Sequence, residues 1–348
     1  MLTGVGLDNR QGLRFEELGG IAARAEQLGF DSIWTPSGTV PDAFHVCAAW
    51  SQATTALRTG ISVVPVARLW NPLSLASQAA TLAQVSGGRF VLGLGAGGSG
   101  DRFWESVGLP NRPIAYMRDY VAVLRGLVSG GTVSVNMPGL RLEGAALSGT
   151  GVIPPVPIYL AALGPQMHHL AGQIADGVLL SWSSPERNRV NREILDEASE
   201  QAGRSRGEVR LAMYVRVCID EDVDAARMAL GRELLGYALG RPGSSTGAYR
   251  SLFGELGFES VLTELEARRA RGDSLDDLVR ASPDELFESV AYFGPAPAAA
   301  AAFTRLTRGV DEAIIRIVPT RPGPDSALRT MTVLQPAPAA SRAHLAGK

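Results

Sequence analysis

Short apolar runs alternate with longer stretches of helical periodicity along most of the chain. The short runs lack strict alternation of apolar and polar positions, which indicates strands that are buried on both faces, as in a parallel sheet covered by helices. Eight such strands are predicted, at residues 3–7, 31–35, 58–64, 89–94, 157–162, 177–182, 210–219 and 311–318. A closed (β/α)8 TIM barrel requires this number of strands. We therefore predict an α/β fold of this kind, with a doubly wound sheet under a helical cap as the alternative.

The stretches between these strands predict the helices of the barrel. They lie at residues 15–28, 43–56, 73–85, 113–128, 166–175, 185–202 and 295–308. Two segments depart from the strand–helix order: residues 131–143 predict a hairpin that turns at Pro138-Gly139, and residues 99–112 predict a long loop.

The segment between the seventh and eighth strands is too long for one crossover helix. Residues 222–240, 247–270 and 283–293 look mostly helical, so we predict a helical insertion around 241–290. The insertion fits within one barrel domain over residues 1–334, because barrels tolerate large insertions. Residues 335–348 are rich in proline and alanine and predict a flexible tail.

Composition narrows the classes of partner. Lys+Arg (33) nearly balance Asp+Glu (35) in 348 residues, which gives no electrostatic reason to expect a nucleic-acid partner. Two cysteines exclude a disulfide framework and a multi-cysteine metal site, and we expect no metal. Neither a signal peptide nor an apolar run of the ~18 residues that a membrane span needs is visible. We expect a cytoplasmic protein that acts on a small molecule, without a membrane partner.

Two turns rich in small residues follow predicted strands. Residues 93–98 (GLGAGG) satisfy the GxGxxG pattern, but they follow the fourth strand and do not open a dinucleotide-binding half-fold. We interpret them as a loop that exposes its backbone at the rim of the barrel. Residues 161–166 (AALGPQ) lead from a strand into a helix, where bare N–H groups and the positive helix end favour an anion. Both turns lie at the carboxyl ends of strands, so we expect them to meet around a phosphate-bearing ligand.

Few side chains in the sequence suggest acid–base chemistry. Asp8 follows the first strand and His45 begins the second helix, and each is a weak candidate for proton transfer. No HExxH, GxSxG or paired-carboxylate pattern is present. A chain poor in such residues and rich in backbone turns suits an enzyme whose cofactor carries the chemistry.

Three segments resemble the bacterial luciferase-like family. They are GFDSIW, the run from RTGISVVPVARLW to RFVLGLGAGG, and PIYLAALGPQMHHLAGQIADGVLLSW. Within the family the match is best to oxidoreductases that use the deazaflavin coenzyme F420. The resemblance implies a TIM barrel with insertions, a homodimer, and coenzyme F420 bound at the C-terminal mouth of the barrel.

The resemblance also assigns coenzyme contacts. Ser62 and Val63 match the position of a non-prolyl cis peptide, in a bulge of the third strand that backs the deazaflavin ring. The loop that contacts the coenzyme's side chain, the turn that receives its phosphate and a region near its tail match Gly95, Ala96, Gly97 and Gly98, then Ala161, Ala162, Leu163, Gly164 and Pro165, then Ser183 and Ser184.

One departure from the family limits the reaction. Sugar-phosphate dehydrogenases of the family carry an Asp-His pair after the second strand, and Ser37-Gly38 stands there in this chain. We therefore expect hydride transfer between the deazaflavin and a C=C, C=N or C=O bond of another substrate. Ser37, His45 and Asp8 remain weak candidates for moving the proton. The alternatives are a monooxygenase that uses reduced flavin mononucleotide (FMN) and a non-catalytic relative that binds a coenzyme.

Overall fold

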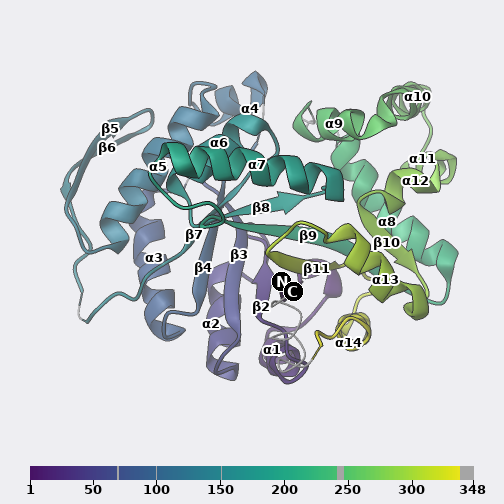
Figure 1. Ribbon diagram of the computed structural model, residues 1–348, viewed down its shortest axis with the longest axis horizontal. Helices are drawn as coiled ribbons and strands as arrows, with labels where there is room; N and C mark the ends of the chain where they lie inside the picture. The colour runs from purple at the N-terminus through teal and green to yellow at the C-terminus, as the bar shows by residue number, and fades with distance from the viewer. Residues whose placement is uncertain (69, 99, 150, 241–246, 338–348) are drawn as a thin grey trace.

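The computed structural model describes residues 1–337, apart from 69, 99, 150 and 241–246. Its centre is a closed barrel of eight parallel strands (Figure 1). The strands are β1 Leu2–Gly6, β2 Ser32–Thr35, β3 Arg58–Pro65, β4 Phe90–Gly95, β7 Ile158–Ala161, β8 Gly177–Ser181, β9 Arg210–Ile219 and β11 Glu312–Ile317. Each pairs with the next in this order, and β11 pairs with β1 to close the ring. The predicted TIM barrel is confirmed, with strand ends that differ from the predicted ones by at most one residue.

Helices cover the outside of this barrel. They are α1 Leu18–Gln27, α2 Ala43–Ala53, α3 Pro72–Val85, α5 Pro113–Val128, α6 Pro165–Ile174, α7 Pro185–Gln201, α13 Ala296–Leu306 and α14 Pro324–Val333. The local sequence favours the start of several of these helices. Asp42 and Asn71 are N-caps of α2 and α3, and their side chains accept hydrogen bonds from backbone N–H groups. Helices α3, α5, α6 and α7 have proline in the first turn. Among the described residues, no helix combines the length and apolar character that crossing a membrane demands.

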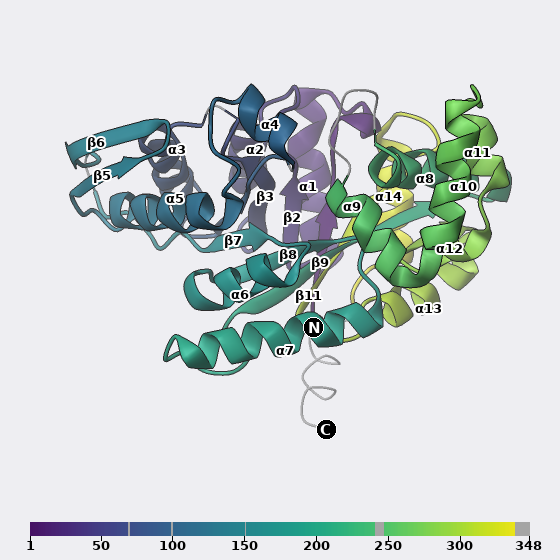
Figure 2. The same ribbon diagram turned by 90° about the horizontal axis from the view of Figure 1, so that it is seen from above.

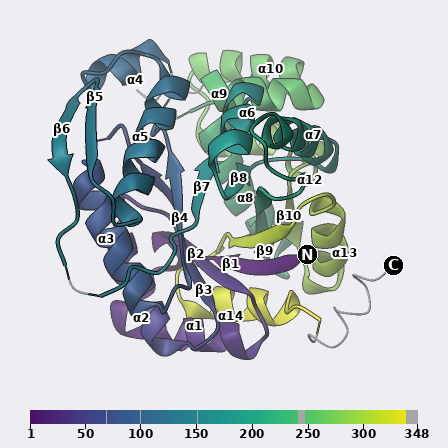
Figure 3. The ribbon, with the colours of Figure 1, turned by 60° about the vertical axis from the view of Figure 1, so that its left-hand side comes forward.

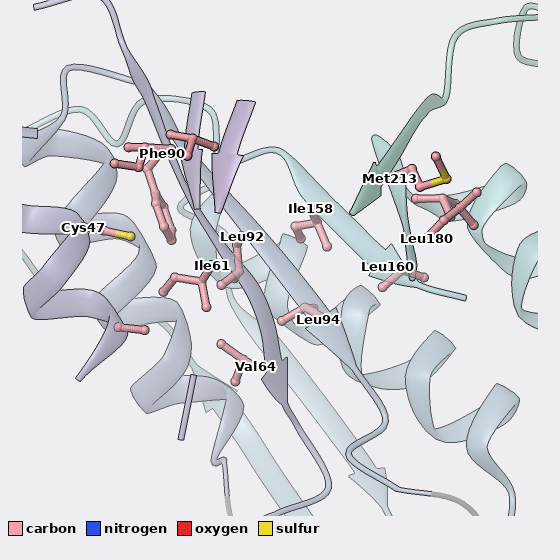
Figure 4. Close-up of a cluster of buried hydrophobic side chains, with 14 of the residues drawn as sticks. Cys47, Ile61, Val64, Phe90, Leu92, Leu94, Ile158, Leu160, Leu180 and Met213 are labelled. Carbon is pink, nitrogen blue, oxygen red and sulfur yellow. The ribbon is translucent and has the colours of Figure 1, made fainter. Parts of the chain in front are cut away.

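The main hydrophobic core lies between the strands and the helices. Ile61, Leu92 and Leu160 project outward from three strands toward helices such as α2, which contributes Cys47 (Figure 4). The alternate residues of the strands point into the barrel, where a smaller apolar cluster includes Trp34. Burial on both faces explains why the strands lack strict alternation in the sequence.

A helical insertion follows β9 and packs at one side of the barrel, opposite the hairpin (Figure 2). It comprises α8 Val223–Ala238, α9 Gly247–Phe253, a π-helical segment Gly254–Phe258, α10 Glu259–Ala270, α11 Leu275–Ala281 and α12 Asp284–Glu288. These helices form a second hydrophobic cluster together with a few barrel residues such as Trp182 and Cys218. Of the insertion predicted around 241–290, residues 241–246 lie outside the described residues, as do 338–348 of the predicted tail.

Two local predictions are wrong. Residues 283–293 are not helical throughout, because the chain leaves α12 and forms β10 Ala291–Gly294, which pairs with the last four residues of the long strand β9. The predicted loop 99–112 contains a short helix, α4 Asp101–Ser106, whose Phe103 and Trp104 are buried together. The predicted hairpin is confirmed as β5 Val133–Met137 and β6 Leu140–Ala145, outside the helices in Figure 3.

Candidate active site

The carboxyl ends of the eight strands meet at one end of the barrel, because all of them run parallel. Tyr214, Arg216 and Arg316 point inward at this mouth, and Asp8 follows β1 beside them. Gly6 gives them room: a Cβ there would lie 2.6 Å from the ring of Tyr214 and 3.5 Å from Cδ of Arg316. The mouth is therefore lined by charged and hydroxyl-bearing side chains, whereas the middle of the barrel is apolar.

Ion pairs connect the charged side chains of the mouth. Asp8 accepts a hydrogen bond from Nε of Arg10 at 2.8 Å and pairs with Arg316. Arg10 also pairs with Glu233 of α8, which in turn accepts from Nε of Arg216 at 3.1 Å. The side chains of Asp8, Glu233 and Arg216 are only 5 to 6% exposed. The sequence analysis missed Arg10, Arg216, Glu233 and Arg316, although arginine near the end of two predicted strands was a usable signal.

Asp8 is held as an anion. Burial raises the pKa of its carboxyl, but the charge of Arg316 and the hydrogen bonds from Arg10 outweigh this and lower the pKa below its ordinary value. An ionised carboxylate clamped between two arginines has no proton to donate near neutral pH. Asp8 is therefore better placed to fix the arginines than to move protons.

Arg216 lies between aromatic rings of the barrel and the insertion. Its guanidinium is 3.9 Å from the centroid of Trp182 and 5.2 Å from that of Tyr237, and Nη1 donates to Oγ of Ser181 at 2.8 Å. Burial lowers the pKa of Arg216 to about 10, so it remains charged at neutral pH. This stacking brings α8 of the insertion against the rim of the barrel.

Strand β3 has a bulge at the mouth. The Ser62–Val63 peptide is cis, as the family resemblance implies, and the register between β3 and β4 shifts at this point. The facing strand makes room for the bulge, because a Cβ on Gly93 would overlap the carbonyl oxygen of Ile61 and one on Gly95 would lie 2.7 Å from Val63. These two glycines of the GxGxxG pattern thus serve strand packing.

The loop after β4 continues from this bulge along the rim. Ala96 and Gly97 are half-buried and Gly98 is exposed, but the ring of Phe103 lies so close to one side of Gly98 that a Cβ there would overlap the ring. The guanidinium of Arg68 lies 5.3 Å from the Phe103 centroid. The loop therefore presents its backbone beside Phe103 of α4, and Arg68 reaches the same ring from the connection after β3.

The turn after β7 exposes the start of α6. Gly164 is its N-cap and is exposed together with Pro165. Nδ1 of His168 donates to the carbonyl of Gly164 at 2.9 Å, and Nη2 of Arg187 donates to that of Leu163 at 3.3 Å. Both bonds engage carbonyl oxygens and therefore occupy none of the N–H groups of the turn, which are the groups that an anion at a helix start would use. Arg187 also pairs with Glu255 of the insertion.

Several solved structures have the same fold as this chain. One is the coenzyme F420-dependent tetrahydromethanopterin reductase from Methanopyrus kandleri, with a TM-score of 0.75 and 22% identity over 95% of this chain and 96% of that one. Another is an F420-dependent secondary alcohol dehydrogenase in complex with an F420-acetone adduct, with a TM-score of 0.72 and 19% identity over 96% of this chain and 99% of that one. The family model for luciferase-like monooxygenases matches residues 1–311. The chain belongs to this family.

Curated relatives in the luciferase-like family include F420-dependent oxidoreductases. The "Putative coenzyme F420-dependent oxidoreductase" of Mycobacterium tuberculosis is 30% identical over 79% of this chain and 82% of its own length. The 5,10-methylenetetrahydromethanopterin reductase of Methanolobus tindarius is 32% identical over 60% of this chain and 63% of its own length. The match thus spans just under two thirds of the methanopterin reductase.

The remaining candidates, three serines and one histidine, differ in burial and in hydrogen bonding in this luciferase-like chain. Ser184 caps α7, and Oγ of Ser183 beside it is buried without a hydrogen-bond partner in the described part of the chain. The same holds for Oγ of Ser37. His45 pairs with Asp42 and its side chain is 78% exposed. The structure brings the turns and serines to the mouth and leaves His45 facing solvent.

Proposed function

We propose that this protein is a coenzyme F420-dependent oxidoreductase, most simply a reductase. The match to the Mycobacterium tuberculosis relative over about four fifths of both chains carries the proposal. The chemistry of the mouth supports it, because its carboxylates Asp8 and Glu233 are tied to arginines and are ill suited to acid–base work of their own. Such a site needs a coenzyme to supply the reactive group.

The residues present at the mouth fit a flat coenzyme that bears a phosphate. The turn from Ala161 through Ala162, Leu163 and Gly164 to Pro165 would hold the phosphate through the backbone N–H groups of its residues other than proline, and Oγ of Ser183 has an unfilled hydrogen bond to offer. The loop at Gly95–Gly98 and the bulge at Ser62–Val63 would lie along the ring and its side chain. When bound, the deazaflavin would supply hydride transfer between its C5 and a C=C, C=N or C=O carbon.

The chain's own groups would orient the reactants. Trp182 and Arg216 form one wall of the mouth and keep it rigid through stacking. Ser37 carries a buried hydroxyl without a partner in the described residues, so it is better placed than Asp8 or His45 to pass a proton. An FMN-dependent monooxygenase is the second candidate, favoured by the more distant structural neighbours that are monooxygenases.

A titration of the purified protein with coenzyme F420 and with FMN tests the proposal through the fluorescence of each. We expect saturable binding of the deazaflavin and much weaker binding of FMN. Ser183→Ala should weaken deazaflavin binding about fivefold to tenfold, since it removes one hydrogen bond worth about 1 kcal/mol. Ser86→Ala is the matched control. The hydroxyl of this buried serine donates to the carbonyl of Ala83 at the C-terminal end of α3, away from the mouth.

The outcomes separate the candidates. Preference for FMN would move the protein to the monooxygenase group, and binding of neither coenzyme would contradict the proposal. Tight deazaflavin binding without turnover of any unsaturated or carbonyl substrate would favour the non-catalytic relative.

A further inference from the structure

The charged residues of the mouth form a chain that alternates in sign. It runs from Arg316 through Asp8, Arg10 and Glu233 to Arg216, with an ion pair at each step. Four of these side chains are at most 11% exposed, and only Arg10 reaches 36%. The chain of charges joins the segment after β1, where Asp8 and Arg10 lie, to α8, β9 and β11, so it links the barrel to the insertion.

The two ends of this chain of charges are neighbours. Arg316 and Arg216 are register partners on adjacent strands β11 and β9. Burial lowers the pKa of Arg216, and the charge of Arg316 lowers it further, as expected for two cations on neighbouring strands. Among the residues described, no carboxylate pairs with both. The chain of alternating charges therefore does not close into a ring, because its two ends, Arg216 and Arg316, are both positive.

The charge count agrees with this gap. Three arginines and two carboxylates leave one net positive charge in a buried cluster. An unbalanced buried charge is costly, whereas one further anion would give three charges of each sign. Guanidinium groups bind carboxylates and phosphates with strong, directional hydrogen bonds.

We propose that the substrate carries a carboxylate or a phosphate group, which binds between Arg216 and Arg316. This inference rests on the proposed function and names the class of its substrate. The guanidinium of Arg316 lies 5.7 Å from the ring centroid of Tyr214, whose hydroxyl bonds to Ser62 in the β3 bulge. The anionic group would thus anchor the substrate beside the bulge, with its reactive carbon over the proposed place of the coenzyme ring.

Isothermal titration of the protein with acetate, succinate and inorganic phosphate at constant ionic strength tests this inference. We expect saturable binding of at least one of these anions, weakened at least tenfold in Arg216→Gln. Glu233→Gln should bind it several times more tightly, because the cluster then carries two net positive charges and Nε of Arg216 is released. Arg232→Gln, on the same helix but paired with exposed Asp276, should match the wild type.

The opposite signs of the two variants separate ligand binding from a purely structural role, which predicts that both variants weaken binding. If Arg216→Gln fails to fold, the tighter binding of Glu233→Gln carries the test. Binding of succinate or acetate alone identifies a carboxylate substrate, and binding of phosphate alone a phosphate ester. Absence of saturable binding, or equal binding by Arg216→Gln, would overturn the inference.

One control variant and the absence of coenzyme from the titrations keep this test apart from that of the proposed function. Anion binding that disappears in Arg187→Gln but persists in Arg216→Gln belongs to the turn at Ala161–Pro165 and also overturns the inference. The titrations need no coenzyme, so failure of deazaflavin binding with intact anion binding would contradict only the proposed function.

Discussion

His168 illustrates how one buried side chain supports the anion turn. It is 1% exposed, its Nδ1 holds the carbonyl of Gly164, and its Nε2 is buried without a partner in the described residues. Burial lowers its pKa from 6.5 to about 4, and the charge of Arg187 acts in the same direction. The imidazole is therefore neutral at pH 7, and its Nδ1–H donates to the carbonyl of Gly164 in the turn.

This shift predicts a pH dependence of stability. The unfolded chain takes up a proton on His168 below pH 6.5, whereas the folded protein resists it down to about pH 4. Stability should therefore be lost as the pH falls through this window, by about 2 kcal/mol at pH 5 from this residue. Urea unfolding at pH 7.5 and pH 5 should show a smaller loss for His168→Gln than for the wild type. Equal losses would contradict the assignment.

At the scale of the elements, hydrophobic pattern and turn chemistry sufficed for most of the barrel. The strands and the hairpin at Pro138-Gly139 follow from short-range signals. Strand β10 did not, because its pairing depends on the free edge that the long strand β9 offers far away in the sequence. Helix α4 was also missed, since six residues give too little periodicity and only the burial of Phe103 and Trp104 fixes it.

The contact between β3 and β4 makes a sharp prediction about Gly93, with a helical glycine as its contrast. Gly93→Ala places a methyl group against the Ile61 carbonyl and 2.7 Å from Leu179, and backbone cannot yield cheaply. We expect a loss of at least about 2 kcal/mol in the free energy of unfolding. Gly236→Ala, in α8 with nothing within 4 Å, should instead gain about 0.5–1 kcal/mol. Urea denaturation of both variants measures the contrast, and similar effects would refute the packing argument.

At the scale of the whole molecule, the backbone turns and the charged mouth differ in how far they could be foreseen. The turns are continuous in sequence, so Gly95–Gly98 and Ala161–Pro165 could be named as candidates from motifs and from the family resemblance. Asp8 and Arg316 are 308 residues apart, and Glu233 reaches them from the insertion. No short-range pattern reports such pairs, because closing the barrel and folding the insertion against it bring them together.

The insertion should tune affinity at the barrel through Arg187. Its guanidinium bonds the Leu163 carbonyl and pairs with Glu255, whose charge competes with any anion on the turn. Glu255→Gln should tighten deazaflavin binding about threefold, a small effect because this carboxylate is 62% exposed. Glu259→Gln, which loses a pair with Arg250 within the insertion, should leave affinity unchanged. Fluorescence titration of both variants is the measurement, and weaker binding by Glu255→Gln would contradict the coupling.

Trp182 gives the mouth an intrinsic optical signal. Its indole is fully buried, its backbone adopts a left-handed φ of 59°, and the charge of Arg216 lies 3.9 Å from the ring. The emission maximum of an indole depends on the electric field across the ring. Any ligand that moves the guanidinium of Arg216 should therefore shift the emission maximum of Trp182. Subtracting the spectrum of Trp182→Phe would isolate this signal from the other four tryptophans. The protein would then report the occupancy of its own mouth without an added dye, which would allow unlabelled compound collections to be screened for substrates.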